Sequence, residues 1–158
     1  MLDDNSRYMQ AAMREAERAY REGEVPVGCI IVHDGQIIGK AHNQRETLQD
    51  PTAHAEVLAI TQAATHLKSW RLEGARLYVT LEPCAMCAGA IILARLDEVH
   101  YGAPDPKAGC SGTLMNLLED QRFNHQPRLH AGLMAKECGG ILTSFFREIR
   151  NSKNSSLN

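Results

Sequence analysis

The feature that most constrains the fold of this chain is a set of three metal-binding side chains divided between two segments. His54 lies in TAHAEVLAI, whereas Cys84 and Cys87 lie in LEPCAMCAGA. The Cys-x-x-Cys spacing at a helix start places both sulfurs on one helix face. Pro83 suits the entry of such a helix, because its missing N–H is not needed there. If all three side chains bind one ion, the starts of two predicted helices must meet at that ion.

One imidazole nitrogen and two thiolates form a donor set that suits zinc. A structural zinc site is closed by four protein ligands, whereas a catalytic site leaves one position open for water. Three donors are evident here, and no second Cys-x-x-Cys accompanies them, which favours an open site. The candidates for a fourth donor are Cys29, Cys110, Cys138, His33 and His42.

Glu56 follows His54 by two residues and has two possible interpretations. It can be a surface residue that complements the dipole of the helix start. It can also be a proton carrier beside a metal, because bound zinc lowers the pKa of its water to roughly 7 and that proton needs an acceptor. His-Ala-Glu alone is weak evidence. Together with the downstream Pro-Cys-x-x-Cys it matches the known signature of zinc-dependent nucleobase deaminases, which favours the catalytic interpretation.

The remaining pattern predicts an α/β fold. Apolar residues recur at helical spacing before Gly23, and Asp34-Gly35 joins two apolar runs as a two-residue hairpin turn would. A polar loop is expected at 43–52. Strands are expected near 27–33, 36–42, 76–81, 97–102 and 128–134, and helices near 53–67, 84–96, 113–120 and 135–150. This alternation predicts a three-layer α/β/α sandwich, with one mixed central sheet and helices on both faces.

The length of 158 residues suits a single domain, expected at 1–150, followed by a polar tail at 151–158 that we expect to be disordered. The chain shows neither a secretory signal nor an apolar run long enough to span a membrane. Its five cysteines favour a reducing, cytoplasmic setting. Because the net charge is −2, any affinity for RNA must come from a local cluster of basic residues.

These motifs resemble those of the bacterial tRNA-specific adenosine deaminases, which belong to the cytidine-deaminase-like superfamily. The resemblance extends from about Tyr8 to Arg150 and includes EVPVG, DPTAHAE, LYVTLEPCAMCAGA, YGAPDPKAG, FNH and FFR. TAHAE followed by EPCAMC is shared with deaminases of free bases. DPTAHAE, NH and the terminal FFR together favour the tRNA enzymes.

The resemblance implies zinc-dependent hydrolytic deamination of adenosine to inosine at the wobble position of a tRNA anticodon. His54, Cys84 and Cys87 would bind one zinc ion per subunit, with water or hydroxide in the fourth position, and Glu56 would transfer protons. The resemblance also implies a homodimer that binds the anticodon stem-loop across both subunits. Implied contacts to the base are Asn43, Val25 and Pro26, and implied contacts along the anticodon loop are Asp105, Lys107, Asn124, His125, Phe145, Phe146 and Arg147.

Alternatives remain open at this point. Asn43 can end a strand, the two phenylalanines can be core residues, and His125 can simply fold its loop. The same zinc mechanism also serves deaminases of a free nucleobase or nucleoside such as guanine, cytosine or cytidine. A non-catalytic, zinc-stabilised binding module is a third hypothesis, and it predicts a fourth protein ligand such as Cys110.

Overall fold

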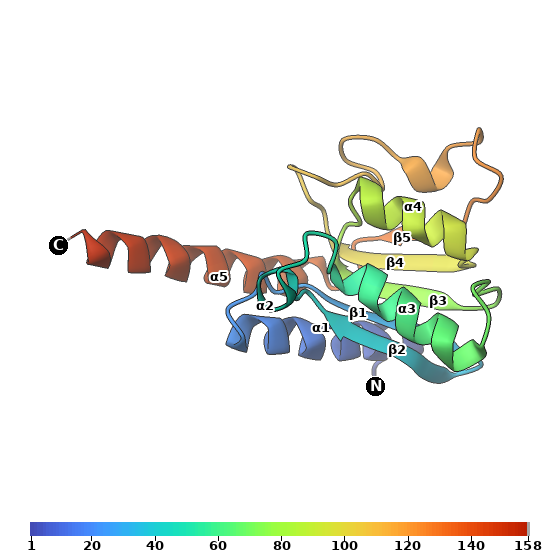
Figure 1. Ribbon diagram of the computed structural model, residues 1–158, viewed down its shortest axis with the longest axis horizontal. Coiled ribbons are helices and arrows are strands. Elements are labelled where there is room, and N and C mark those ends of the chain that lie inside the picture. Colours follow the sequence, from blue (N-terminus) through green and yellow to red (C-terminus); the bar gives the residue numbers. More distant parts are fainter. Residues whose placement is uncertain (158) are drawn as a thin grey trace.

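A five-stranded mixed sheet forms the centre of the computed structural model, which describes residues 1–157 (Figure 1). Its strands are β1 (Gly28–His33), β2 (Gln36–His42), β3 (Arg76–Leu81), β4 (Glu98–Ala103) and β5 (Arg128–Ala131), in the order β2-β1-β3-β4-β5. Strand β1 is antiparallel to both of its neighbours, whereas β3, β4 and β5 are parallel. The predicted mixed sheet is confirmed.

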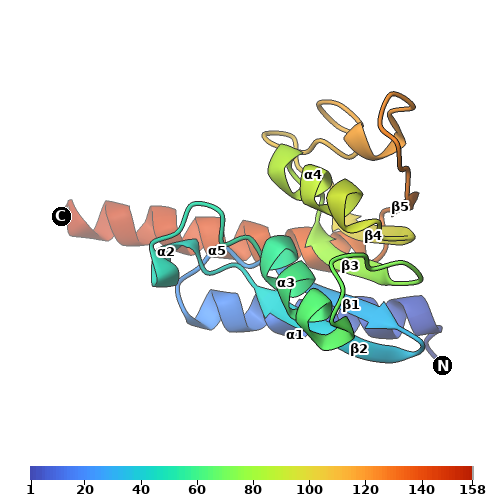
Figure 2. The ribbon, with the colours of Figure 1, turned by 45° about the vertical axis from the view of Figure 1, so that its right-hand side comes forward.

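Helices cover both faces of this sheet, as predicted. One face carries α1 (Asp4–Arg21) and α5 (Ala135–Ser156), and the other carries α3 (Ala55–Leu67) and α4 (Ala85–Ala94) (Figures 1 and 2). Alternate residues of each strand therefore enter two separate cores: Ile30 and Tyr78 pack under α1, and Ile31 and Leu77 pack on the opposite face. Within residues 1–157, no helix combines the length and the apolar character needed to cross a bilayer.

Two segments show how far local sequence determines local structure. The hairpin turn forms as predicted, with Asp34 and Gly35 both at positive φ (49° and 74°). The segment predicted as a loop at 43–52 instead contains the short helix α2 (Arg45–Leu48). That prediction was wrong because the group that stabilises α2 is a carboxylate that lies far away in the sequence and is described below.

The C-terminal helix continues into the polar segment for which the sequence suggested a disordered tail. Residues 151–156 extend α5, and all of their side chains are exposed. Figure 1 shows this end of α5, in red, projecting well beyond the sheet. The predicted helix at 113–120 is reduced to one 3-10 turn, Leu117–Glu119.

Helices α1 and α3 approach the sheet so closely that two strand positions have no room for a side chain. A Cβ atom on Gly28 would collide with the carbonyl oxygen of Ala12 and lie 2.5 Å from the nitrogen of Ala16, both in α1. A Cβ atom on Gly39 would lie 2.5 Å from the carbonyl oxygen of Ala59 in α3. Helix backbone cannot yield as a flexible side chain can, so these glycines set the distance between the layers.

We therefore expect Gly28→Ala to lower the free energy of unfolding by about 1–3 kcal/mol, the usual cost of overpacking a core. Urea denaturation followed by circular dichroism measures this loss. Gly140→Ala is the matched control, because a Cβ atom on Gly140, in exposed α5, meets no atom within 4 Å. Alanine there should stabilise the helix by up to about 1 kcal/mol. Equal effects of the two substitutions would contradict the close-packing argument.

Candidate active site and metal centre

The candidate metal centre forms where the N-termini of α3 and α4 meet. His54 and Cys84 are the N-cap residues of the two helices, and Cys87 lies in the first turn of α4. Nδ1 of His54 lies 3.6 Å from Sγ of Cys84 and 3.5 Å from Sγ of Cys87. All three donor atoms lie within 4.8 Å of one another, so this donor set is consistent with a metal site.

None of the candidate fourth donors joins this group. Among residues 1–157, the group contains no further His, Cys, Asp or Glu within the same reach. Cys110 is buried, and its backbone N–H donates to the carbonyl oxygen of Pro83, 2.9 Å away. Three protein donors are what a site with one open coordination position requires.

The two cysteines shift each other's pKa in opposite directions. A hydrogen bond from Cys87 lowers the pKa of Cys84 to about 3 against the opposing effect of burial, and His54 adds to the lowering. The same hydrogen bond, followed by burial, raises the pKa of Cys87. A hydrogen bond to Cys84 likewise raises the pKa of His54. A cation at this position would favour the thiolate of both cysteines, as would the partial positive charge of the helix start.

Glu56 is buried beside these donors in the first turn of α3 and is only 4% exposed. Burial raises the pKa of its carboxyl group to about 7. A group with this pKa accepts and releases protons readily near neutral pH, as a general acid and base must. Burial also removes the main support for the interpretation of Glu56 as a surface residue that only complements the helix dipole.

A cavity of about 180 Å³ opens beside His54, Cys84 and Glu56. This space is far larger than a single water molecule needs. Of the positions that the resemblance implied for substrate, Val25, Asn43 and Asp105 line it, whereas Pro26 is buried outside its wall. The lining also includes residues that the sequence analysis missed: Val27, Arg45, Ala55, Leu81, Glu82 and Ala108.

Glu82 fastens the loop that closes one side of the cavity. Its buried carboxylate accepts hydrogen bonds from the backbone N–H groups of Asp105, Ser111 and Thr113 at 3.0–3.1 Å, and from the hydroxyl of Thr113. Burial alone would raise the pKa of Glu82, but these hydrogen bonds outweigh it and lower the pKa. The sequence did contain a signal: Glu82 is an acidic residue between the apolar strand RLYVT and Pro83, where a buried carboxylate needs donors from elsewhere.

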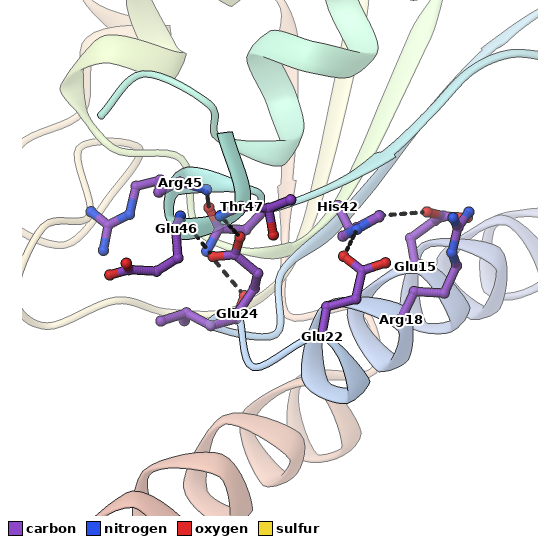
Figure 3. Close-up of polar contacts among 10 residues, drawn as sticks. Glu15, Arg18, Glu22, Glu24, His42, Arg45, Glu46 and Thr47 are labelled. Atoms are coloured by element: carbon purple, nitrogen blue, oxygen red, sulfur yellow. Dashed lines mark hydrogen bonds and ion pairs between the residues drawn. The ribbon is translucent and has the colours of Figure 1, made fainter. Parts of the chain in front are cut away.

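A second buried carboxylate, Glu24, positions the opposite wall. It accepts hydrogen bonds from the backbone N–H groups of Glu46 (3.1 Å) and Thr47 (2.7 Å), which have no partner within the helix because they lie in the first turn of α2 (Figure 3). Arg45 in the same helix lines the cavity. The side-chain oxygen of Asn43 accepts from the N–H of Arg45 at 3.3 Å, and its amide nitrogen donates to the carbonyl of Val25 at 3.2 Å.

His42 anchors the end of β2 immediately before these residues. Its Nδ1 atom lies 3.3 Å from Oε2 of Glu15, and its Nε2 atom lies 2.7 Å from Oε2 of Glu22 (Figure 3). Glu15 lies in α1, and Glu22 is the C-cap residue of that helix. His42 and Glu15 are buried, and Arg18 pairs with the other oxygen of Glu15 at 3.5 Å. Helix α1 thus supports the strand end that places Asn43 at the cavity.

The other positions implied for RNA contact lie outside the cavity lining. Lys107 and Asn124 are exposed in loops. Nε2 of His125 lies 2.7 Å from the carbonyl oxygen of Leu96, so this side chain helps to fold its loop.

The terminal aromatic pair divides between core and surface. Phe145 is buried and makes an edge contact with Tyr20 of α1, with ring centroids 5.5 Å apart. Phe146 and Arg147 are exposed. Phe145 therefore docks α5 onto α1, and its two neighbours remain accessible.

A sequence model of MafB19-like deaminases matches residues 3–150. The chain belongs to the MafB19-like deaminase family. Curated relatives include the tRNA-specific adenosine deaminase of Bacillus subtilis (strain 168), which is 58% identical over 92% of this chain and 91% of that protein. The tRNA-specific adenosine deaminase of Aquifex aeolicus (strain VF5) is 46% identical over 92% of this chain and 95% of that protein.

Solved structures agree with this family membership. A structure from studies of A-to-I editing by tRNA:A34 deaminases at the wobble position of transfer RNA superimposes with a TM-score of 0.83 and 41% identity, and the match covers 86% of this chain and 99% of that one. A guanine deaminase from Nitrosomonas europaea gives a TM-score of 0.80 over 92% of this chain and 86% of that one, at 18% identity. At that identity it shows only that this deaminase-family fold is shared.

The position of Glu24 leads to a test of how α2 is stabilised. Glu24→Gln leaves one acceptor oxygen for two part-buried N–H groups, so we expect the free energy of unfolding to fall by about 1–3 kcal/mol. Hydrogen exchange of the Glu46 and Thr47 amides should also become faster. Glu46→Gln is the matched control on α2, since Glu46 is exposed, and it should change stability by less than about 0.5 kcal/mol. Unchanged exchange in Glu24→Gln would contradict this role.

The lowered pKa of Glu82 gives a pH dependence. Its ionised form is favoured in the folded state, so the stabilisation is fully present above the unfolded pKa near 4.5 and is lost as pH falls through the lower folded pKa. Denaturation in urea at a series of pH values should show Glu82→Gln already destabilised at pH 7. Below about pH 4.5 its stability should fall less steeply than that of the wild type. Parallel curves for the two proteins would rule out this contribution.

Proposed function

We propose that this chain catalyses the hydrolytic deamination of adenosine to inosine at the wobble position of a tRNA anticodon. The observation that carries the proposal is a buried carboxylate, Glu56, beside a His-Cys-Cys donor set at the wall of a cavity. The relatives described above, named as tRNA-specific adenosine deaminases and matched over nearly the whole chain, support the choice of substrate.

His54, Cys84 and Cys87 would bind zinc, because one borderline nitrogen donor and two soft sulfur donors are its usual ligands. Zinc bound there would supply a nucleophile, since it lowers the pKa of a water ligand to roughly 7. The raised pKa of Glu56 suits the complementary task of moving protons at neutral pH.

Hydrolysis forms a bond from oxygen to C6 of adenine and breaks the bond from C6 to the exocyclic nitrogen. The Glu56 carboxylate would accept a proton from the attacking water and deliver it to ring N1, which makes C6 more electrophilic. It would then carry the second water proton to the departing nitrogen, which leaves as ammonia. Glu56 ends ionised, as it began, and inosine retains the proton on N1.

The cavity walls would position the base. Asn43 is fixed by hydrogen bonds to Val25 and Arg45, so its amide group is held at the cavity wall with little freedom to rotate. Val25 and Leu81 offer apolar surface for the ring. Asp105, Lys107, Asn124, Phe146 and Arg147 remain proposed contacts to the anticodon loop, and His125, Phe145 and Pro26 would act by supporting their segments.

A homodimer completes the proposal. Exposed apolar side chains occur on α4 and in the loop after β4, namely Leu93, Leu114 and Met115, at 71%, 56% and 54% exposure. Burying such a surface against a second copy would remove apolar area from water, and RNA could then contact both subunits.

The decisive test is the conversion of adenosine to inosine at the wobble position of an anticodon stem-loop. Zinc-loaded wild-type protein should form inosine, and Glu56→Gln should lower the rate at least 10²-fold, about the smallest contribution of a general acid–base residue. Inosine is quantified by mass spectrometry after nuclease digestion.

Glu73→Gln is the matched control, because Glu73 is an exposed glutamate outside the cavity lining, and it should retain wild-type turnover. Zinc content of each variant is measured in parallel, so that loss of metal is not mistaken for loss of the proton carrier. Turnover of free adenosine, cytidine or guanine without turnover of the stem-loop would refute the RNA substrate. Full activity of Glu56→Gln would refute the mechanism.

A further inference from the structure

Two rows of side chains cross the parallel half of the sheet on the face that carries α1 and α5. One row runs from Tyr78 through His100 to His130, residues paired across β3, β4 and β5. Their rings stack, with centroids 4.7 Å apart for Tyr78 and His100 and 4.5 Å apart for the two histidines. The neighbouring row consists of Arg76, Glu98 and Arg128 in the same register.

The two rows meet at a single carboxylate oxygen. Oε1 of Glu98 lies 2.7 Å from Nε2 of His100 and 3.3 Å from Nε2 of His130. All three atoms lie within 4.8 Å of one another. Glu98 is 15% exposed and His100 only 5%, whereas His130 is half-exposed at the sheet edge and can turn toward a ligand from solvent.

We propose that Glu98, His100 and His130 form a second metal site for a borderline divalent transition-metal ion such as zinc. Two imidazole nitrogens and one carboxylate oxygen are a donor set that such ions accept, and it contains no sulfur. The stack on Tyr78 restricts the His100 ring, so part of the site is organised in advance. Water would complete the coordination from the open side next to His130.

The charges around the site determine its affinity for a metal ion. Arg128 pairs with the other oxygen of Glu98, Oε2, at 3.0 Å, and Arg76 lies on the opposite side of the row. These two arginines leave Oε1 available but repel a metal cation, so this site binds metal more weakly than the His-Cys-Cys centre. Protonated histidines would also compete, which makes binding weaker at acidic pH.

The site lies away from the proposed active site. Glu98 and Arg128 are the first residues of β4 and β5, whereas the His-Cys-Cys centre follows the last residues of β3. A bound ion would link β4 to β5, the four-residue edge strand that leads into α5. Its expected effect is therefore on the stability of this edge and not on the chemical step.

Zinc binding to the holoprotein tests this assignment. Protein with its His-Cys-Cys centre filled is dialysed against Zn²⁺ at neutral pH, and zinc per chain is measured by mass spectrometry. We expect two zinc ions in the wild type and one in His130→Ala. His66→Ala is the matched control, since His66 is an exposed histidine on α3, and it should retain two.

Three further readouts separate this site from adventitious binding. Added Zn²⁺ should raise the melting temperature of the wild type and of His66→Ala, because a ligand of the folded state stabilises it, but not that of His130→Ala. Co²⁺ bound as the second ion should show no sulfur-to-cobalt charge-transfer band. Arg128→Gln should bind the second ion roughly two- to fivefold more tightly, the range for removal of one exposed ion pair.

His130 is chosen because it is half-exposed, so its replacement should leave the fold intact. A wild-type chain that binds only one zinc ion would overturn the assignment, and Glu98 would then serve only as the partner of His100, His130 and Arg128. Retention of the second ion by His130→Ala would overturn it as well.

Discussion

The convergence of the N-termini of α3 and α4 is the constraint on which the rest of the structure depends. Each helix contributes its N-cap residue to the centre, so both helices must begin at the same edge of the sheet and on the same face. Two helix starts bring two partial positive charges together, and thiolates or a carboxylate beside them reduce that repulsion. The order β2-β1-β3-β4-β5 satisfies this requirement. Helix α3 follows β2 in the chain and helix α4 follows β3, and these two strands lie on either side of β1.

Two buried carboxylates complete the site from outside the catalytic motif. Glu82 organises the loop after β4 through backbone N–H groups, and Glu24 does the same for the first turn of α2. Neither needs a cationic partner, because several N–H dipoles pointing at one carboxylate stabilise its charge. Two parts of the cavity wall, α2 and the loop after β4, are therefore each fixed by a single carboxylate acceptor.

Local chemistry explains which features the sequence predicted. The Asp34-Gly35 turn, the buried strand at 76–81 and the Cys-x-x-Cys helix start depend on neighbouring residues, and the structure contains all three. Helix α2 was missed because its stabilising acceptor lies more than twenty residues away, in Glu24. The contact between Phe145 and Tyr20 also depends on how α5 folds back over α1, which no local pattern encodes. The role of Glu56 as a proton carrier was an expectation of chemistry, whereas its burial comes from the packing of α3 against the sheet.

The projecting end of α5 has a consequence for the local unfolding of the chain. Phe145 is its last buried residue, so the turns from 146 to 156 are held by their own hydrogen bonds and by little else. A helical stretch of that length is marginal in water, because few residues share the cost of starting it. Its amides should therefore exchange with solvent through local fraying, while those of β1 and β3 exchange only when the sheet opens. The amides of the central sheet should thus be the best protected from exchange, and those at the end of α5 the least protected.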